Sequence, residues 1–252
     1  MTDHILIERA GETGAINVIR FNRPDKKNAI TRAMYSTMAQ ALIDGDNDDS
    51  VRVHVMLGTP GTFTSGNDMQ DFMAVAMGAA KGTEVFDFLI ALASASKPIV
   101  SGVDGLAIGI GTTIHMHCDL TFATKDSRFH TPFVDLALVP EAGSSLLAPA
   151  AMGHQKAFAL LAAGIPFTGE DAERAGLIYK VVSTDELEPA VFAAADHLAA
   201  KPPKALAISR RLVKPDPEPV VARIREEGEL FASQLKSAEA LAAFQAFMAR
   251  KK

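Results

Sequence analysis

Two glycine-containing turns, each placed after a predicted strand, are the stretches of this sequence best suited to chemistry. Residues 100–113 read as a buried strand that breaks at glycines and continues as an apolar helix. The first turn of a helix has four amides without intrahelical partners and carries roughly half a positive charge. Residues 63–68 form a second glycine turn after another strand. Two amides that converge from separate loops are what an oxyanion hole needs, so we expect these turns to bind an anionic centre.

Glycine lets a chain pass close to a ligand, and Gly105, Gly109 and Gly111 lie at the strand-to-helix turn. The alternative is that these glycines serve close packing only, as isolated glycines often do. Two such turns after two strands favour the functional interpretation.

The composition is typical of a globular protein with a large core. The chain has 252 residues, of which 48% are hydrophobic and 22% charged. The formal net charge of −5 argues against nucleic acid as a partner, because phosphate binding needs a basic face. The single cysteine, Cys118, excludes an internal disulfide and fits a reducing compartment. We find no export signal and no apolar run able to span a bilayer, and therefore expect a cytoplasmic protein without a membrane partner.

The elements that position the turns alternate between strands and helices, which predicts a stacked α/β core. Thr31 is expected to cap a helix that runs to about residue 44. Residues 109–117 are expected to form the helix that follows the strand of the 100–113 stretch. Pro140 suits the first position of a further helix. The other expected strands are 5–9, 16–22, 51–57, 119–124 and 180–182, and the other expected helices are 85–94, 154–163, 169–175 and 184–199.

The best internal boundary is Lys-Pro-Pro at residues 201–203. The chain beyond it is expected to be helical only, and three helices without a sheet need a surface to cover. We therefore divide the chain into a core at 1–200 and a helical region at 201–252 that covers the site or makes oligomer contacts. Phe231, Phe244 and Phe247 in this region are interpreted as core or oligomer-contact aromatics. The expected helices are 204–214, 219–235 and 237–250.

Five short pieces follow one another along the chain in a recognisable order. They are Asn-Arg-Pro at 22–24 with Asn-Ala-Ile at 28–30, Phe-Thr-Ser-Gly-Asn-Asp at 63–68, Gly-Leu-Ala-Ile-Gly-Ile-Gly at 105–111, Cys-Asp at 118–119 and Pro-Glu-Ala-Gly-Ser-Ser at 140–145. In these pieces the chain resembles the crotonase (enoyl-CoA hydratase/isomerase) superfamily, and the match covers nearly its whole length. The resemblance implies stacked ββα units with roughly perpendicular sheets, homotrimers or dimers of trimers, and an acyl-CoA thioester substrate. Coenzyme A is then part of the substrate, and no separate cofactor is expected.

The resemblance also implies which residues carry the reaction. The family's oxyanion amides correspond to Asn67 and Ile110, where Ile110 departs from the glycine that many members have. The two glutamates of a typical hydratase correspond to Thr113 and Phe133, neither of which can titrate. A carboxylate instead stands at Glu141, which is similar to the Δ3,Δ2-enoyl-CoA isomerases of fatty-acid metabolism. The alternatives are a hydratase or another crotonase-type reaction, and an acyl-CoA-binding subunit without activity.

One carboxylate suffices for isomerisation, because it can remove a proton from C2 and return it at C4 while the oxyanion hole holds the enolate. A helix dipole at Glu141 would increase its acidity, whereas an apolar wall of Phe133, Leu138 and Val139 would oppose this by desolvation. This balance stays open. The simpler alternative is that Glu141 only pairs with the helix dipole.

The remaining expected contacts with the acyl-CoA also rest on the resemblance. Lys26 and Lys27 are either solvated surface charges or partners of the coenzyme A phosphates. Asp68 is expected to cap a helix rather than to orient ligand. A metal site at His115, His117 and Cys118 is not expected, because the two histidines fall on different faces of a helix. Residues 69–82 are expected to border the acyl pocket, and the other expected contacts are Ala29, Ser65, Gly66, Met69, Gly109 and Phe133.

Overall fold

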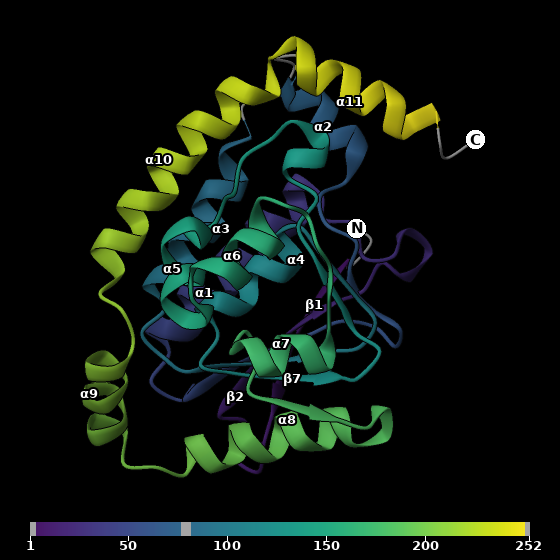
Figure 1. Ribbon diagram of the computed structural model, residues 1–252. Coiled ribbons are helices and arrows are strands. Elements are labelled where there is room, and N and C mark those ends of the chain that lie inside the picture. The colour runs from purple at the N-terminus through teal and green to yellow at the C-terminus, as the bar shows by residue number, and fades with distance from the viewer. Residues whose placement is uncertain (1–3, 77–81, 250–252) are drawn as a thin grey trace.

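The computed structural model describes residues 4–76 and 82–249, and within them the strands form two sheets (Figure 1). The four-stranded sheet has the order β4 (Thr62–Thr64), β6 (Leu106–Ile108), β8 (Arg128–His130) and β9 (Phe167–Thr168). The six-stranded sheet has the order β1 (Ile5–Ala10), β2 (Ile16–Phe21), β3 (Val53–Leu57), β5 (Ile99–Val103), β7 (Leu120–Thr124) and β10 (Lys180–Val182).

Three successive units repeat the same order of strand, strand and helical segment. Strands β3, β5 and β7 pair in parallel in the large sheet, and the strand after each of them, β4, β6 and β8, pairs in parallel in the small sheet. Helices α2 (Met69–Ala76) and α3 (Thr83–Ser94) follow β4, α4 (Ile110–Thr113) follows β6, and the short 3-10 helix η3 (Val134–Leu136) follows β8. The expected stacked ββα architecture is confirmed.

The central strands of the large sheet are buried on both faces. Strands β3 and β5 have no exposed residue, and their sequences are mainly apolar, with His54 in β3 and Ser101 and Gly102 in β5. Helix α8 (Thr184–Ala199) packs Leu187, Val191 and Ala195 on one face of the sheet. The other helices of the body are α1 (Arg32–Asn47), α5 (Ser144–Met152), α6 (His154–Leu161) and α7 (Gly169–Ala175), with 3-10 segments η1 (Pro24–Lys26) and η2 (Ile114–His117).

Local signals set most helix ends. Thr31 is the N-cap of α1, as predicted, and its hydroxyl accepts a hydrogen bond from the Met34 amide at 3.4 Å. The predicted helix at 109–117 is an α-helical turn over 110–113 that tightens into the 3-10 segment η2. The prediction that Pro140 begins a helix is wrong. Ala142 and Gly143 are both left-handed, with φ of 64° and 69°, and this turn delays the start of α5 to Ser144.

The C-terminal region is helical, as predicted, and forms an arch along one side of the body (Figure 1). It consists of α9 (Pro203–Val213), α10 (Pro217–Leu235) and α11 (Ala238–Ala249). Helix α10 packs on α3 and α5, and α11 contacts η3. None of the residues of α9 is buried within the described chain. In the described part of the chain, no helix is long and apolar enough to cross a bilayer.

Candidate active site

The two predicted amide donors lie after neighbouring strands of the small sheet. Strands β4 and β6 pair in parallel, so their carboxyl ends meet at one edge, and the loops carrying Asn67 and Ile110 leave from that edge. Among the hydrogen bonds of the described residues, neither amide N–H has a protein acceptor. Both residues line one cleft of about 600 Å³. The structure therefore places both predicted donor residues on one cleft, and their action as an oxyanion hole stays a prediction.

Glycine backbone geometry at Gly66 and Gly109 shapes these loops. Gly66 has a φ of 89°, and a Cβ there would lie 3.0 Å from the carbonyl oxygen of Ile108. Gly109 has a φ of 58° and a ψ of −119°, a conformation that L-residues rarely adopt, and it precedes the first residue of α4. Ile110 keeps its side chain in the core, at 1% exposure, which leaves its amide free despite the departure from glycine.

A buried tyrosine fixes the side chain of the first donor residue. The Tyr35 hydroxyl donates to Oδ1 of Asn67 at 2.6 Å from the second turn of α1. Burial, together with the negative charge of Glu141, raises the pKa of Tyr35 well above its usual value, so the phenol is a donor. Sequence reasoning missed Tyr35, because its bond to Asn67 is a long-range contact that no local spacing reveals.

Glu141 faces the same cleft, and its carboxylate points inward. The Thr113 hydroxyl donates to Oε1 of Glu141 at 2.6 Å, so one of the residues replacing a family glutamate serves as its partner. Burial raises the pKa of Glu141 to about 8, against the lowering effect of the Thr113 hydrogen bond and with a smaller raising effect from Glu227. Desolvation therefore wins the balance that the sequence left open.

The helix dipole does not explain Glu141, contrary to the simpler alternative. Glu141 precedes the first helical residue of α5, Ser144, by three positions, and its side chain does not cap that helix. The carboxylate that accepts from the amides at this helix start is Glu227 of α10, bonded to Gly143 and Ser145. The expectation that Glu141 sits at a helix start is wrong, because the left-handed turn at Ala142 intervenes.

A neutral histidine also contacts the backbone of this turn. Nε2 of His117 lies 2.7 Å from the carbonyl oxygen of Ala142, and burial lowers the pKa of His117 to about 4. The imidazole is therefore neutral and donates from Nε2. A left-handed alanine costs about 1–3 kcal/mol, and this hydrogen bond helps to maintain it. His117 thus acts on the backbone beside Glu141.

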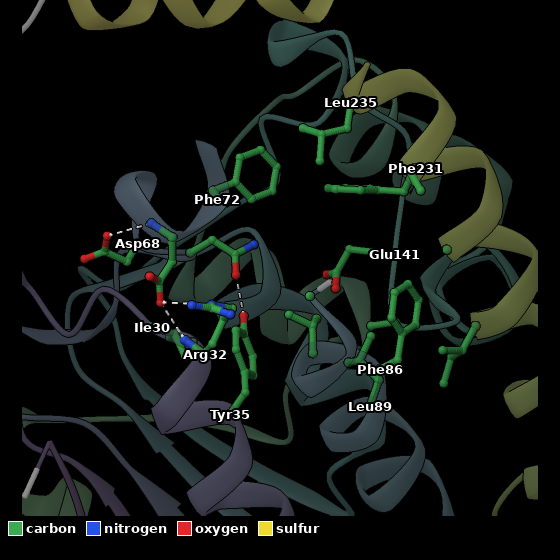
Figure 2. Close-up of a pocket in the computed structure, with 18 residues that line it drawn as sticks. Ile30, Arg32, Tyr35, Asp68, Phe72, Phe86, Leu89, Glu141, Phe231 and Leu235 are labelled. Carbon is green, nitrogen blue, oxygen red and sulfur yellow. Dashed lines mark hydrogen bonds and ion pairs between the residues drawn. The ribbon is translucent and has the colours of Figure 1, made fainter. Parts of the chain in front are cut away.

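Two hollows meet at Glu141. The first is the cleft described above, and the second is a chamber of about 130 Å³ between α1, α3 and α10 (Figure 2). Glu141, Asn67, Phe72 and Phe231 line both. Figure 2 shows the Glu141 carboxylate directed into the space below Phe72 and Phe231. The apolar side chains lining the chamber are Ile30, Phe72, Val85, Phe86, Leu89, Ile224, Phe231, Ala232 and Leu235.

Three other carboxylates face these hollows, and none resembles Glu141. Asp68 is held by Arg23 at 2.7 Å, and Asp71 accepts from the amide of Arg32 at 2.8 Å. Asp135 is exposed on η3. Of the carboxylates that line the cleft or the chamber, Glu141 is the one whose pKa is raised toward neutrality.

The cleft brings together eight of the twelve residues predicted for catalysis or binding. It is lined by Ser65, Gly66, Asn67, Met69, Gly109, Ile110, Phe133 and Glu141. Of the predicted apolar wall, Phe133 and Leu138 line the cleft and Val139 does not. Of the segment expected to border the acyl pocket, Met69 lines the cleft and Gly82 the chamber, while 77–81 lie outside the described residues.

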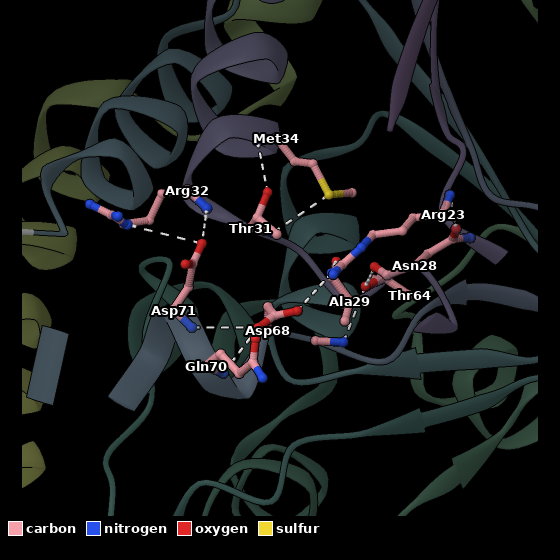
Figure 3. A network of polar contacts seen from close by, with 11 residues as sticks. Arg23, Asn28, Ala29, Thr31, Arg32, Met34, Thr64, Asp68, Gln70 and Asp71 are labelled. Carbon is pink, nitrogen blue, oxygen red and sulfur yellow. Dashed lines mark hydrogen bonds and ion pairs between the residues drawn. The ribbon is translucent and has the colours of Figure 1, made fainter. Parts of the chain in front are cut away.

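The other four predicted contacts lie beside the cleft. Asp68 caps α2, accepting from the amide of Gln70 at 3.0 Å, which agrees with its interpretation as a cap (Figure 3). Ala29 accepts a hydrogen bond from Arg23 at 2.9 Å in the same network. Lys26 ends η1 and Lys27 follows it, and both are exposed. The carbonyl oxygen of Lys27 accepts from the amide of Ser65, which joins this segment to the cleft.

Aromatic side chains from the C-terminal region complete the site. Phe231 and Phe244 each contact Phe72, with ring centroids 6.0 and 5.4 Å apart, and all three line the cleft. Both were predicted as core or oligomer-contact residues, and Phe244 is indeed 3% exposed. His130 also lines the cleft, and burial lowers its pKa. His130 was not predicted as a site residue, whereas Phe72 belongs to the segment 69–82 that was expected to border the acyl pocket. The side chain of Phe247, which was predicted together with Phe231 and Phe244, lies outside the described residues.

The chain is built of stacked ββα units, and two free amides and a desolvated carboxylate line the same cleft. These features define a protein of the crotonase fold. Comparison with known proteins agrees, because the family model described as enoyl-CoA hydratase/isomerase matches residues 11–252. The chain therefore belongs to the enoyl-CoA hydratase/isomerase family.

Individual relatives carry both names. The chain is 35% identical over 244 residues to enoyl-CoA delta isomerase 2 of Rattus norvegicus, covering 94% of this chain and 62% of that protein. It thus spans about three fifths of the rat protein's length. A probable enoyl-CoA hydratase of Rhizobium meliloti is 28% identical over 98% of this chain and 96% of its own. The solved structure of Pseudomonas aeruginosa OdaA has a TM-score of 0.91 and 41% identity, covering 98% of this chain and 99% of that chain.

Proposed function

We propose that this protein isomerises 3-enoyl-CoA to 2-enoyl-CoA, with Glu141 as the base that moves the proton. The observation that carries the proposal is a single desolvated carboxylate at the junction of the cleft and the chamber. A pKa of about 8 suits a group that must accept and then return a proton near neutral pH. The delta isomerase name of the rat relative supports the same reaction.

The reaction needs only groups that the chain supplies. The Glu141 carboxylate removes a proton from C2, and the electrons of that C–H bond move into the thioester carbonyl to form an enolate. The amides of Asn67 and Ile110 donate to the enolate oxygen, each contributing roughly 3–4 kcal/mol in comparable sites. The enolate then collapses, C4 takes the proton from the Glu141 carboxylic acid, and the double bond lies between C2 and C3. No electrons enter or leave the substrate.

The rest of the site serves to hold the thioester. We place the apolar acyl chain in the chamber beyond Phe72 and Phe231, since desolvation of apolar surface favours it there. We place the coenzyme A moiety along the open cleft, beside Ser65 and the loop of Lys26 and Lys27. Gly66 lines the cleft as well, and Ala29 and Asp68 belong to the polar network of Arg23 (Figure 3).

Assembly and location follow the same proposal. Helix α9 exposes Ile208, Leu212 and Val213, at 52%, 79% and 86%, which supports a contact between copies in a homotrimer or a dimer of trimers. Light scattering of the purified protein tests the assembly. The reducing compartment implied by a single cysteine supports a cytoplasmic location, which cell fractionation tests.

The reaction is tested by replacing Glu141 with Gln and following formation of the conjugated 2-enoyl thioester from a 3-enoyl thioester. We expect turnover to fall by about 10²–10⁴-fold, the usual contribution of a positioned acid–base group. Asp135→Asn is the matched control, because Asp135 is exposed and also lines the cleft. Unchanged turnover in Glu141→Gln would refute the mechanism. Water addition to a 2-enoyl thioester by the native protein, without isomerisation, would favour a hydratase, and binding without any reaction would favour a non-catalytic subunit.

A further inference from the structure

A carboxylate of the C-terminal region is buried against the backbone that follows Glu141. Glu227 on α10 is 4% exposed. Its Oε2 accepts from the amide of Gly143 at 2.6 Å and its Oε1 accepts from the amide of Ser145 at 2.9 Å. The amides of the first helical turn lack intrahelical partners, and Gly143, the N-cap of α5, has no side chain to satisfy them. Glu227 therefore fills the role of the missing cap from a distant part of the chain.

This bond fixes the residues that immediately follow Glu141. Ala142 and Gly143 form the left-handed turn, and His117 donates to the carbonyl oxygen of Ala142. Side-chain hydrogen bonds from two distant residues, Glu227 and His117, thus hold the backbone of this turn. The direction of the Glu141 side chain depends on this turn, because no regular helix or strand contains residue 141.

We propose that Glu227 is a positioning residue for Glu141, and that it holds the turn after Glu141 through its hydrogen bonds to the amides of Gly143 and Ser145. The proposal rests on the proposed function only in giving Glu141 a reaction to perform. The hydrogen bonds of Glu227 to Gly143 and Ser145 do not depend on which reaction Glu141 performs.

A substitution at Glu227 leaves the other groups that face Glu141 unchanged. After burial, Glu227 is the group that raises the pKa of Glu141, and Thr113 lowers it. Removing the charge of Glu227 should therefore change the titration midpoint of Glu141. The other titratable groups facing the same hollows or the same turn are Arg32, Tyr35, Asp68, Asp71, His117, His130 and Asp135.

The experiment compares Glu227→Gln and Glu227→Asp with the native protein, using infrared difference spectra of the protonated Glu141 carboxyl as a function of pH. The Glu141 band is assigned by its loss in Glu141→Gln. Glu229→Gln is the matched control, because Glu229 is an exposed carboxylate on the same helix. In the native chain Arg223 of α10 donates to Oγ of Ser145 of α5 at 3.0 Å, and none of these substitutions removes either partner of this contact.

In Glu227→Gln, we expect the Glu141 titration midpoint to move to lower pH, because a negative neighbour is gone. We expect Glu227→Asp to keep the midpoint close to the native value, because it keeps the charge. Since both variants loosen the turn, kcat should fall by up to about 10²-fold in each, with a smaller change in KM. Glu229→Gln should match the native protein in both measurements.

A native midpoint in Glu227→Gln together with native kcat overturns the proposal. A fall in thermal stability with the midpoint and kcat both unchanged also overturns it, since Glu227 would then be a structural cap only. Failure of the proposed function gives a different pattern. The native protein would then not isomerise the thioester, while the Glu141 midpoint would still respond to Glu227→Gln and not to Glu229→Gln.

Discussion

The hydrogen bond between Thr113 and Glu141 gives the sharpest prediction about the base. Thr113→Val removes the hydroxyl but keeps a side chain of nearly the same shape in a site that is fully buried. The bond is 2.6 Å long, and a hydrogen bond to a charged group contributes about 1.5–3 kcal/mol. Because Thr113 lowers the pKa of Glu141, its removal raises that pKa further above about 8. Each 1.4 kcal/mol is a factor of ten, so the ionised fraction of Glu141 at neutral pH falls about 10- to 100-fold.

The assay is the pH dependence of kcat for conversion of a 3-enoyl to a 2-enoyl thioester. The base must be ionised, so activity rises as pH rises through the pKa, and Thr113→Val moves this rise to higher pH. The rate at neutral pH should fall with the ionised fraction, and much of it should return in alkaline buffer. Thr113→Ser keeps the hydroxyl and should stay close to the native profile. The reasoning is refuted if Thr113→Val titrates like the native protein, or if its rate is low at every pH.

Three further predictions concern stability, the oxyanion hole and the chamber. Because the pKa of Glu141 is raised from 4.5 to about 8, the folded state holds an extra proton between these values, and its stability falls as pH rises through them. Above pH 8, Glu141→Gln should therefore have a free energy of unfolding a few kcal/mol at most above that of the native protein, and a higher melting temperature. The difference should disappear at acid pH. Gly109→Ala has room for its Cβ but not the right φ, so it should displace the Ile110 amide and lower kcat about 10²-fold, with KM nearly unchanged, in steady-state kinetics. A Cβ at Gly228 would overlap the ring of Phe86, so Gly228→Ala should push this ring into the chamber. We expect kcat/KM to fall about tenfold for long-chain thioesters but little for short ones, and equal losses would contradict this placement of the acyl chain.

Much of the fold was predictable because local pattern and burial agree. The apolar residues of β3 and β5 predict strands, and Thr31 predicts the start of α1. The two glycine turns were predictable as well, because a glycine turn depends on residues close together in the sequence. The strands that these turns follow in the small sheet, β4 and β6, were not predicted, because each has only three residues.

The supporting contacts were not predictable, because they join distant parts of the chain. Pro140 is compatible with a helix start, yet the left-handed turn at Ala142 moves that start to Ser144. Tyr35 reaches Asn67 across elements, and no spacing rule announces this contact. Glu227 did leave a signal, because it falls among Val220, Ile224 and Leu235 on the buried stripe of α10. A charged residue in such a stripe needs a buried partner.

Helix α10 couples two properties that an engineer would prefer to alter separately. Its side chains form a wall of the chamber, and the same helix carries the carboxylate that grips the turn after Glu141. Sliding or tilting this helix to admit a bulkier acyl group would also move Glu227, and with it the turn that positions Glu141. Changes in chain-length preference should therefore arise by exchanging individual side chains on a stationary α10, which predicts that natural variants of this scaffold vary in the bulk of their chamber walls and keep the helix in place.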